Sequence, residues 1–305
     1  MLPVELSLPN DVDLKNLLEK LRELSWGCAD ILMAYARGEK PPYGFSQSLN
    51  VQDNEDGPVS AADLAVNNWL LKGFESTYPF VNWEILSEET YKSKSTNNDL
   101  LDKEWVWILD PLDGTKDFLL GTGEYAVHLA LTHHQEVVLG VVLIPELEEL
   151  WFGVIGHSAW YENRLGQKKY PSFSHNSELD EMVLVASRSH RDKRLEALID
   201  GMKIGQQKSV GSIGCKIATI LKGESDIYVS LSGQTAPKDW DLAAPAAILI
   251  AAGGMFTHAD GKPLIYNTGD ISQRGCLIAT NGIKHDVICK QAIKIMDNID
   301  PGFLT

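Results

Sequence analysis

Long apolar runs, paired cysteines and basic residues are all scarce in this chain, and each scarcity excludes a class of protein. No apolar run in the 305 residues approaches the ~20 residues needed to span a bilayer. The first residues, Met1-Leu2-Pro3-Val4-Glu5, lack the basic and apolar regions of a secretory signal. The four cysteines form no CxxC pair and no metal-ligand spacing. We therefore expect reduced, mostly buried thiols in a cytoplasmic protein with no membrane partner.

Positive charge is also in short supply. The sequence has 27 Lys and Arg against 42 Asp and Glu, a formal net charge of −15. Proteins bind nucleic-acid polymers through clustered Lys and Arg, so we expect no such polymer as a partner. An acidic protein that handles anionic small molecules needs metal ions or a local basic patch.

Several catalytic motifs are missing as well. The chain has no GxxxxGK[ST] phosphate loop, no GxGxxG opening a βαβ unit and no HExxH zinc motif. Residues 110–114 lack the alternating ligands of an EF-hand loop. Gly211-Ser212-Ile213-Gly214 is one glycine out of register for a nucleophile elbow. What remains is a chain with 44% hydrophobic residues, long enough for one large domain or two ordinary ones.

The most informative stretch is residues 105–118. Five large apolar residues, Trp105-Val106-Trp107-Ile108-Leu109, indicate a strand buried on both faces. Asp110-Pro111 and Asp113-Gly114 then break the run, because proline fixes φ and glycine accepts φ > 0. Asp, Pro and Gly also simply make good turns. Two carboxylates with Gly114 and Thr115 beside them nevertheless suit a divalent cation that carries a phosphate.

Other acidic residues stand at the ends of predicted elements. Asp63 and Ser60 fit a capping pair at the start of a helix, which is a complete structural explanation of Asp63. Glu88-Glu89 follow an apolar strand, although adjacent glutamates are usually a solvated surface. Asp241 opens an alanine-rich helix and could be its N-cap. His133-His134 lie at a predicted turn with no third ligand nearby in the sequence, so we interpret them as surface histidines.

Hydrophobic periodicity predicts the order of elements. The first half reads as a long helix, a polar loop or hairpin, a second helix, a strand, an exposed loop and an antiparallel meander. The second half reads as alternating strands and helices. The expected ranges are helices at 11–37, from 58, at 192–200 and around 216–221; loops at 46–57, 91–103 and 209–214; and strands at 83–87, 105–109, 126–132, 137–144, 150–154, 159–161, 182–186, 227–231, 255–258 and 276–280. The polar stretch 166–180 predicts a boundary between halves 1–165 and 166–305.

Two strings resemble one known family. Asp110-Pro111-Leu112-Asp113-Gly114-Thr115 and, about 130 residues later, Trp240-Asp241-Leu242-Ala243-Ala244 resemble the two signatures of the inositol monophosphatase superfamily. Lys116-Asp117-Phe118 is more similar to its 3′(2′),5′-bisphosphate nucleotidase branch. The resemblance covers residues 11–295. It implies an α+β / α/β fold, the layered αβαβα sandwich, and a lithium-sensitive phosphatase that acts as a monomer or homodimer.

The resemblance also implies roles for particular residues. Glu88, Asp110 and the carbonyl of Leu112 would hold a first metal ion, and Asp110, Asp113 and Asp241 a second. Asp63 with Thr115 would orient the attacking water, and the backbone at Gly114-Thr115 would receive phosphate. Ligands that are all oxygen favour Mg²⁺, two or three per site, or Mn²⁺.

The expected substrate is 3′-phosphoadenosine 5′-phosphate, and it depends on weaker similarities. Residues 187–190 and 209–216 resemble the nucleotide-binding segments of the branch. They nominate Ser212 and Lys216 for the 5′-phosphate and His190 for the base. Lys216 could equally be a solvated helix lysine. Two other hypotheses are an inositol or broad sugar-phosphate phosphatase and a non-catalytic binding protein. Gln234 makes the inositol phosphatase less favourable, because inositol-specific members have glutamate at this position. Gln52-Asp53 depart from the branch, which has a lysine in this loop.

Overall fold

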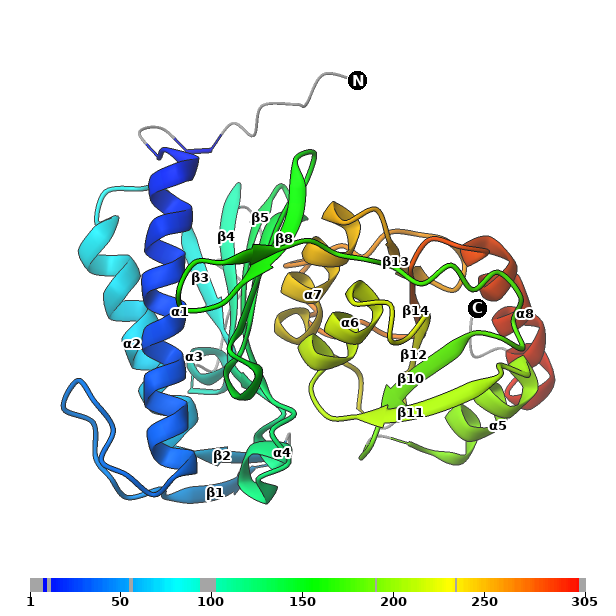
Figure 1. Cartoon of the computed structure of the whole chain (residues 1–305), viewed down its shortest axis with the longest axis horizontal. Coiled ribbons are helices and arrows are strands. Elements are labelled where there is room, and N and C mark those ends of the chain that lie inside the picture. Colours follow the sequence, from blue (N-terminus) through cyan, green and yellow to red (C-terminus); the bar gives the residue numbers. More distant parts are fainter. Residues whose placement is uncertain are drawn as a thin grey trace.

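The computed structural model describes residues 8–9, 12–54, 57–93, 103–189, 191–233 and 235–301. These residues form five stacked layers in which a seven-stranded sheet and a five-stranded sheet enclose one pair of helices (Figure 1). The arrangement confirms the expected αβαβα sandwich. No helix in the described ranges is both long and apolar enough to cross a membrane.

The first layer consists of two long helices and the hairpin between them: α1 (Leu14–Ala36), β1 (Val51–Asn54), β2 (Gly57–Ser60) and α2 (Ala61–Thr77). Helix α1 begins where the Asp13 carboxylate accepts a hydrogen bond from the backbone N–H of Asn16, at 2.9 Å. Helix α2 begins at Ser60 with the predicted capping box. Leucines such as Leu21 and Leu70 face the sheet and are fully buried, because helical spacing collects them on one stripe.

The larger sheet follows the order β3-β4-β5-β6-β7-β8-β9. Only β3 and β4 run parallel, so the predicted antiparallel meander is confirmed from β4 onward. The strands are β3 (Glu84–Ser87), β4 (Trp105–Asp113), β5 (Ala126–His133), β6 (Glu136–Ile144), β7 (Glu149–Val154), β8 (Ser158–Glu162) and β9 (Lys168–Lys169).

Two predictions at the edge of this sheet need correction. Strand β4 was expected to stop before Asp110, but it continues to Asp113, which pairs with Ala126 after a shift in register. Pro111 lies in the bulge between Asp110 and Asp113, so the strand continues past the proline. The expected loop at 91–103 is wrong at its start, because Glu88–Ser93 is a short helix, α3. Its remainder to residue 102 lies outside the described residues.

The middle layer holds α6 (Ile213–Leu221) and α7 (Asp239–Ala251). Helix α7 lies with its backbone almost against the larger sheet, because the facing strands carry glycine. A Cβ atom at Gly140 would lie 2.5 Å from the carbonyl oxygen of Ala244, and one at Gly153 would lie 2.4 Å from Cα of Ile248. This close approach brings the first turn of α7 to the end of β4.

The last two layers are a mixed sheet and the helices that cover it. The sheet order is β11-β10-β12-β14-β13, with the first three strands parallel and the last two pairings antiparallel. The elements are β10 (Val183–Ser187), α5 (Lys193–Met202), β11 (Gln206–Val210), β12 (Ile227–Leu231), β13 (Met255–His258), β14 (Cys276–Thr280) and α8 (His285–Ile299).

Predictions for this second part missed one strand and one helix. Strand β11 was missed, since a loop was expected at residues 209–214, and α8 was not predicted. Helix α5 continues through Gly201 and ends at Lys203, which adopts φ 53°. Two short elements, α4 (Thr115–Leu120) and η2 (Pro145–Leu147), complete the chain.

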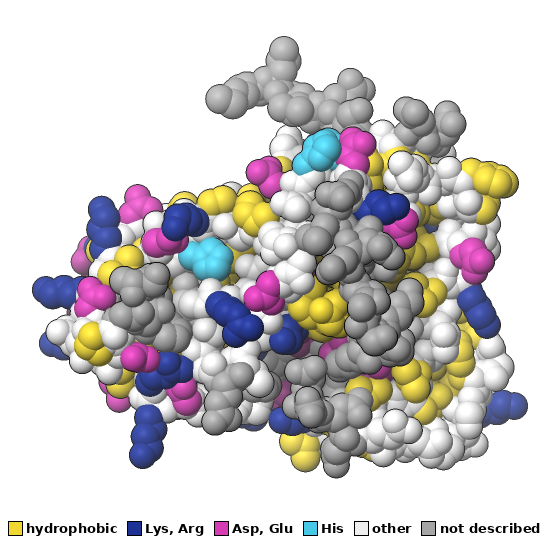
Figure 2. All heavy atoms as spheres, turned by 180° about the vertical axis from the view of Figure 1, so that it is seen from behind, with side chains coloured by type: hydrophobic (Ala, Val, Ile, Leu, Met, Phe, Trp, Pro, Cys, Tyr) yellow, Lys and Arg dark blue, Asp and Glu magenta, His cyan; other side chains and the backbone are white. Residues whose placement is uncertain are grey.

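Three apolar cores separate the layers. The first lies between α1, α2 and the larger sheet, and the third lies under α5 and α8. The middle core contains Val106 and Ile108 together with Ile217 and Ala243. Residues on both sides of position 165 thus share it, and the division at 166–180 stays a prediction. On the face drawn in Figure 2, the described Lys and Arg side chains are dispersed among Asp and Glu.

Candidate active site

Three aspartates converge where β4 ends. Asp110 and Asp113 come from the end of that strand, and Asp241 comes from the third residue of α7. One oxygen atom from each carboxylate lies within 4.8 Å of those of the other two. Asp110 is 1% exposed, whereas the other two are partly exposed. The structure therefore brings together three of the four predicted carboxylate ligands as one tight cluster.

Backbone N–H groups hold each of these carboxylates in place. The N–H of Leu112 donates to Asp110 Oδ1 at 3.0 Å, and the N–H of Lys238 donates to Asp241 Oδ2 at 2.6 Å. Asp241 thus lies at the third helical position. It is not the N-cap residue, which was the purely structural role considered for it. At Asp113, Oδ2 accepts from Ile213 N at 2.5 Å and from Gly214 N at 3.3 Å. These bonds orient the cluster before any cation arrives.

Burial and mutual repulsion disfavour the charged form of this cluster. Burial, followed by the charges of Glu88, Asp113 and Asp241, raises the pKa of Asp110 well above its ordinary value. Burial and then Asp113 and Glu88 raise the pKa of Asp241 in the same way. A bound cation would remove both penalties. The donor set is oxygen only, which fits Mg²⁺ or Mn²⁺.

Glu88, the fourth predicted carboxylate ligand, is brought to the same place by strand pairing. Strand β3 runs parallel to β4, with Ser87 opposite Leu109, so the residues that follow the two strands meet at one edge. Glu88 lines the cavity at the cluster, and its charge helps to raise the pKa of Asp110. The structure therefore places Glu88 close to Asp110 at the cavity, and its role as a metal ligand stays a prediction.

Asp63 lies behind the cluster and contacts it through Thr115. The Thr115 hydroxyl lies 3.0 Å from Asp63 Oδ1 and 3.1 Å from the carbonyl oxygen of Leu112. Asp63 Oδ2 accepts hydrogen bonds from the Ser60 N–H at 2.8 Å and the Ser60 hydroxyl at 2.6 Å. Burial raises the pKa of Asp63 against the lowering effect of these bonds. The carboxylate therefore caps α2 and holds the Thr115 hydroxyl at the same time.

Gly114 permits the sharp turn between the aspartates and Thr115. It adopts φ 91°, in the left-handed region where other residues are strained. A Cβ atom there would also lie 3.1 Å from the carbonyl oxygen of Glu124. The turn needs glycine for both reasons.

A cavity of about 240 Å³ opens over the cluster. Acidic residues line one side, and residues of α6, β12 and the loop before α7 line the other. Among the predicted site residues, the cavity is lined by Glu88, Asp110, Leu112, Asp113, Gly114, Thr115, Lys216 and Asp241. Asp63 and Ser212 do not line it.

Lys216 is not the solvated lysine that its sequence also allowed. It is 2% exposed, its ammonium donates to the carbonyl of Gly211, and it lies 5.8 Å from the ring centroid of Tyr228. Burial lowers the pKa of Lys216, and the charge of Asp113 opposes that shift. Lys216 is therefore a buried cation in the lining of the cavity, which also includes Lys116 and Lys238.

The remaining predicted recognition residues fare differently. The Ser212 hydroxyl is the N-cap of α6, accepting from Cys215 N at 3.2 Å, and the residue is 1% exposed. Its side chain therefore has a structural role. His190 and Gln234 lie outside the described residues, as does the side chain of Asp53.

Sequence reasoning missed two polar residues beside the cluster. His128 is fully buried on β5, with Nδ1 3.3 Å from the Trp240 carbonyl oxygen and Nε2 3.4 Å from Asp113 Oδ2. Arg188 forms ion pairs with Asp117 and Glu124 at the rim. For His128, the available signal was a histidine inside the apolar strand predicted at 126–132.

Comparisons with known proteins agree with this geometry. The model of the inositol monophosphatase family matches residues 13–297. The 3′(2′),5′-bisphosphate nucleotidase CysQ of Salmonella typhimurium is 32% identical over 253 residues, 82% of this chain and 94% of that protein. The same-named Escherichia coli K12 protein is 31% identical over 252 residues, 82% of this chain and 94% of that protein. An Anabaena inositol monophosphatase superposes with a TM-score of 0.70 at 25% identity, over 93% of this chain and 97% of that one. The chain therefore belongs to the inositol monophosphatase family.

Proposed function

We propose that this protein is a Mg²⁺-dependent phosphomonoesterase that removes the 3′-phosphate of 3′-phosphoadenosine 5′-phosphate, giving AMP and phosphate. The observation that carries the proposal is that the cluster of Asp110, Asp113 and Asp241 and the buried Lys216 line one cavity. Relatives that share about a third of the sequence are named for this activity. A cation held by the carboxylates would attract the reacting phosphate. The ammonium of Lys216 would attract the non-reacting one.

The carboxylates are proposed to hold two metal ions, with a third position open. Glu88, Asp110 and the Leu112 carbonyl would hold one ion, and Asp110, Asp113 and Asp241 the other. Bound there, Mg²⁺ or Mn²⁺ would supply positive charge that activates a water molecule and offsets the charge of the phosphoryl group. The raised pKa values of Asp110 and Asp241 support this assignment, since a cation favours the ionised cluster.

Asp63 and Thr115 are proposed to handle the proton of the attacking water. The water oxygen forms a bond to phosphorus, the bond from phosphorus to the ribose O3′ breaks, and O3′ takes up a proton from solvent that replaces the one the attacking water gives up. Thr115 can orient the water and pass its proton to Asp63, because its hydroxyl already lies 3.0 Å from Asp63 Oδ1. The raised pKa of Asp63 makes it a stronger base than an exposed aspartate.

Lys216 is the proposed contact for the 5′-phosphate. An ammonium has three N–H donors, so the Gly211 carbonyl uses only one of them. Contacts to this non-reacting phosphate would help to position the 3′-phosphate at the carboxylates. Backbone N–H groups at Gly114-Thr115 are proposed to receive the reacting phosphate.

We further propose that the enzyme works in the cytoplasm. All four cysteines, Cys28, Cys215, Cys276 and Cys289, are buried and unpaired. This is the state expected of thiols in a reducing compartment.

Steady-state kinetics with Mg²⁺ test the proposal directly. 3′-Phosphoadenosine 5′-phosphate should exceed both 3′-AMP and inositol 1-phosphate by more than ~10-fold in kcat/KM, since a charge-assisted contact contributes roughly 1.5–3 kcal/mol. Lys216→Met, which keeps the side-chain volume but removes the charge, should erase most of the advantage over 3′-AMP. Lys262→Ala on the surface is the matched control.

The outcomes separate the hypotheses. Equal kcat/KM for the bisphosphate and inositol 1-phosphate would favour a broad sugar-phosphate phosphatase. No turnover of any phosphomonoester would favour a non-catalytic binding protein. A Lys216→Met enzyme that keeps its full preference for the bisphosphate would remove Lys216 from substrate recognition.

A further inference from the structure

A second group of metal-type ligands lies at the other end of strand β4. Glu104 precedes the strand, and His133 and His134 lie where its neighbour β5 turns back. Their ligand atoms all lie within 4.8 Å of one another. The structure places both histidines at the surface, as expected. It also brings Glu104 to them from 29 residues away through strand pairing, which the sequence did not show.

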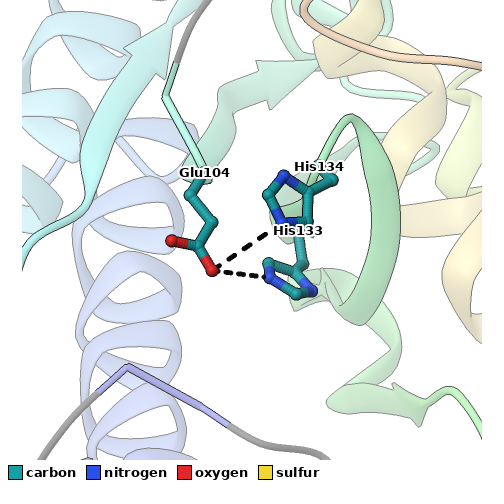
Figure 3. Close-up of side chains that lie close together, drawn as sticks. All are labelled: Glu104, His133 and His134. Atoms are coloured by element: carbon teal, nitrogen blue, oxygen red, sulfur yellow. Dashed lines mark hydrogen bonds and ion pairs between the residues drawn. The ribbon is translucent and has the colours of Figure 1, made fainter.

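The three side chains already point at a common position (Figure 3). Glu104 Oε1 lies 2.9 Å from His133 Nε2 and 3.8 Å from His134 Nε2. Two ligand atoms of a tetrahedral ion are ~3.3 Å apart for bonds of about 2.0–2.1 Å. The observed spacings bracket that value, so small side-chain rotations would complete the arrangement.

The backbone and a neighbouring ring fix this geometry. Trp105 pairs with His133 across the sheet and stacks on its ring, with centroids 4.1 Å apart and planes at 15°. The N–H of His134 donates to the carbonyl oxygen of Glu104 at 2.9 Å. His133 therefore lies on a paired strand, and the backbone of His134 is hydrogen-bonded to the residue that precedes the neighbouring strand.

The turn itself is unusual. His134 and Gln135 form a two-residue hairpin turn with φ 48° and 69°, where Asn-Gly is the favoured pair. The turn is also anchored on the second half of the chain, since Gln135 O accepts from Tyr266 N at 2.9 Å. Two residues with side chains thus occupy left-handed positions at some cost in strain.

We propose that Glu104, His133 and His134 form a surface site for a divalent transition metal such as Zn²⁺ or Co²⁺. Two imidazoles and one carboxylate suit these ions, whereas Mg²⁺ prefers oxygen ligands. All three side chains are open to solvent, at 54%, 34% and 70% exposure. Water can therefore supply the fourth ligand. The proposal does not depend on the proposed phosphatase activity.

Titration with Zn²⁺ in excess Mg²⁺ tests the site. To remove the carboxylate cluster as a competing site, the protein carries Asp110→Asn. One equivalent of Zn²⁺ should bind, and the affinity should fall at least ~10-fold on losing a ligand in His133→Phe or His134→Ala. His133→Phe keeps a ring to stack on Trp105, so a loss of binding cannot be assigned to lost packing. His157→Ala, an exposed histidine at another turn, is the matched control.

Co²⁺ gives an independent readout. Four-coordinate Co²⁺ bound by two imidazoles should give a visible absorption spectrum that disappears in His133→Phe. In the protein with Asp110 intact, Glu104→Gln and His134→Ala should leave Mg²⁺-dependent turnover unchanged. In the Asp110→Asn protein, a Zn²⁺ affinity that does not change on adding both His133→Phe and His134→Ala would overturn the proposal. So would the absence of any equivalent bound below ~0.1 mM, a binding free energy weaker than about −5.5 kcal/mol.

Discussion

The two ends of β4 carry two groups of possible metal ligands with opposite character, about 26 Å apart along the strand at 3.3 Å per residue. At one end, Asp110, Asp113 and Asp241 are held by backbone N–H groups in a cavity and repel one another. At the other, Glu104 lies in solvent and pairs with two histidines. The two groups differ in burial, in the kind of donor and in the number of acids, which is three at the buried end and one at the exposed end. The first cluster is unstable when charged unless a cation joins it, and the second is not.

The largest expected effect separates the two ends by activity. Asp110→Asn should reduce turnover by at least ~10³-fold, because it removes a carboxylate proposed to bridge two metal ions. Glu104→Gln should change turnover less than twofold, since Glu104 is remote from the cavity. Phosphate release with Mg²⁺ measures both. More than a few per cent of activity in a folded Asp110→Asn protein would contradict the two-metal assignment.

The next effect tests the proton path at the buried end. Thr115→Ala should lower kcat by about 10²–10³-fold with little change in KM, because positioned proton transfer contributes about 10²–10⁴-fold. Thr115→Ser keeps the hydroxyl beside Asp63 Oδ1 and should restore most of the rate. If Thr115→Ala and Thr115→Ser are equally impaired, the hydroxyl has no role in the reaction.

The smallest effect concerns stability and pH, and its sign should differ between the ends. In metal-free protein the pKa of Asp110 is raised, so the folded state binds more protons than the unfolded state above pH ~4. Asp110→Asn should therefore change Tm little at pH 4 and raise it by a few degrees at pH 7. The hydrogen bond from His133 lowers the pKa of Glu104, so Glu104→Gln should instead become slightly destabilising above pH ~4.5.

Thermal unfolding of both variants with and without Mg²⁺ measures this difference. Mg²⁺ should raise Tm of the unchanged protein more at pH 7 than at pH 4, and raise Tm of Asp110→Asn less. A Tm gain in Asp110→Asn that is independent of pH would show that charge repulsion is not its cause.

The sequence predicted features that depend on local order along the chain. The apolar run before Asp110 and the capping pair of Ser60 and Asp63 are both readable within a few residues, and both are confirmed. Strand β11 was missed because its residues, Gln-Gln-Lys-Ser-Val, are polar at an exposed edge. Such a strand forms through backbone hydrogen bonds to β10, and its side chains give no sign of that pairing in the sequence.

Features that depend on register could not be read from the sequence. Glu104 becomes a neighbour of His133 only because Trp105 pairs with His133, and a slip of one residue would reverse the faces. His128 faces Asp113 for the same reason. Lys216 was ambiguous because burial of a helix lysine depends on the sheets that enclose α6. In each case the missing information was which strands are neighbours and by what offset.

The glycines under α7 have a consequence for which mutations the protein can accumulate. At Gly140 and Gly153 a single methyl group would collide with the helix backbone, and the helix would have to lift from the sheet. Asp241 stands on the first turn of that helix, so lifting would move it away from Asp110. Two positions without functional groups therefore limit which substitutions leave Asp241 in place.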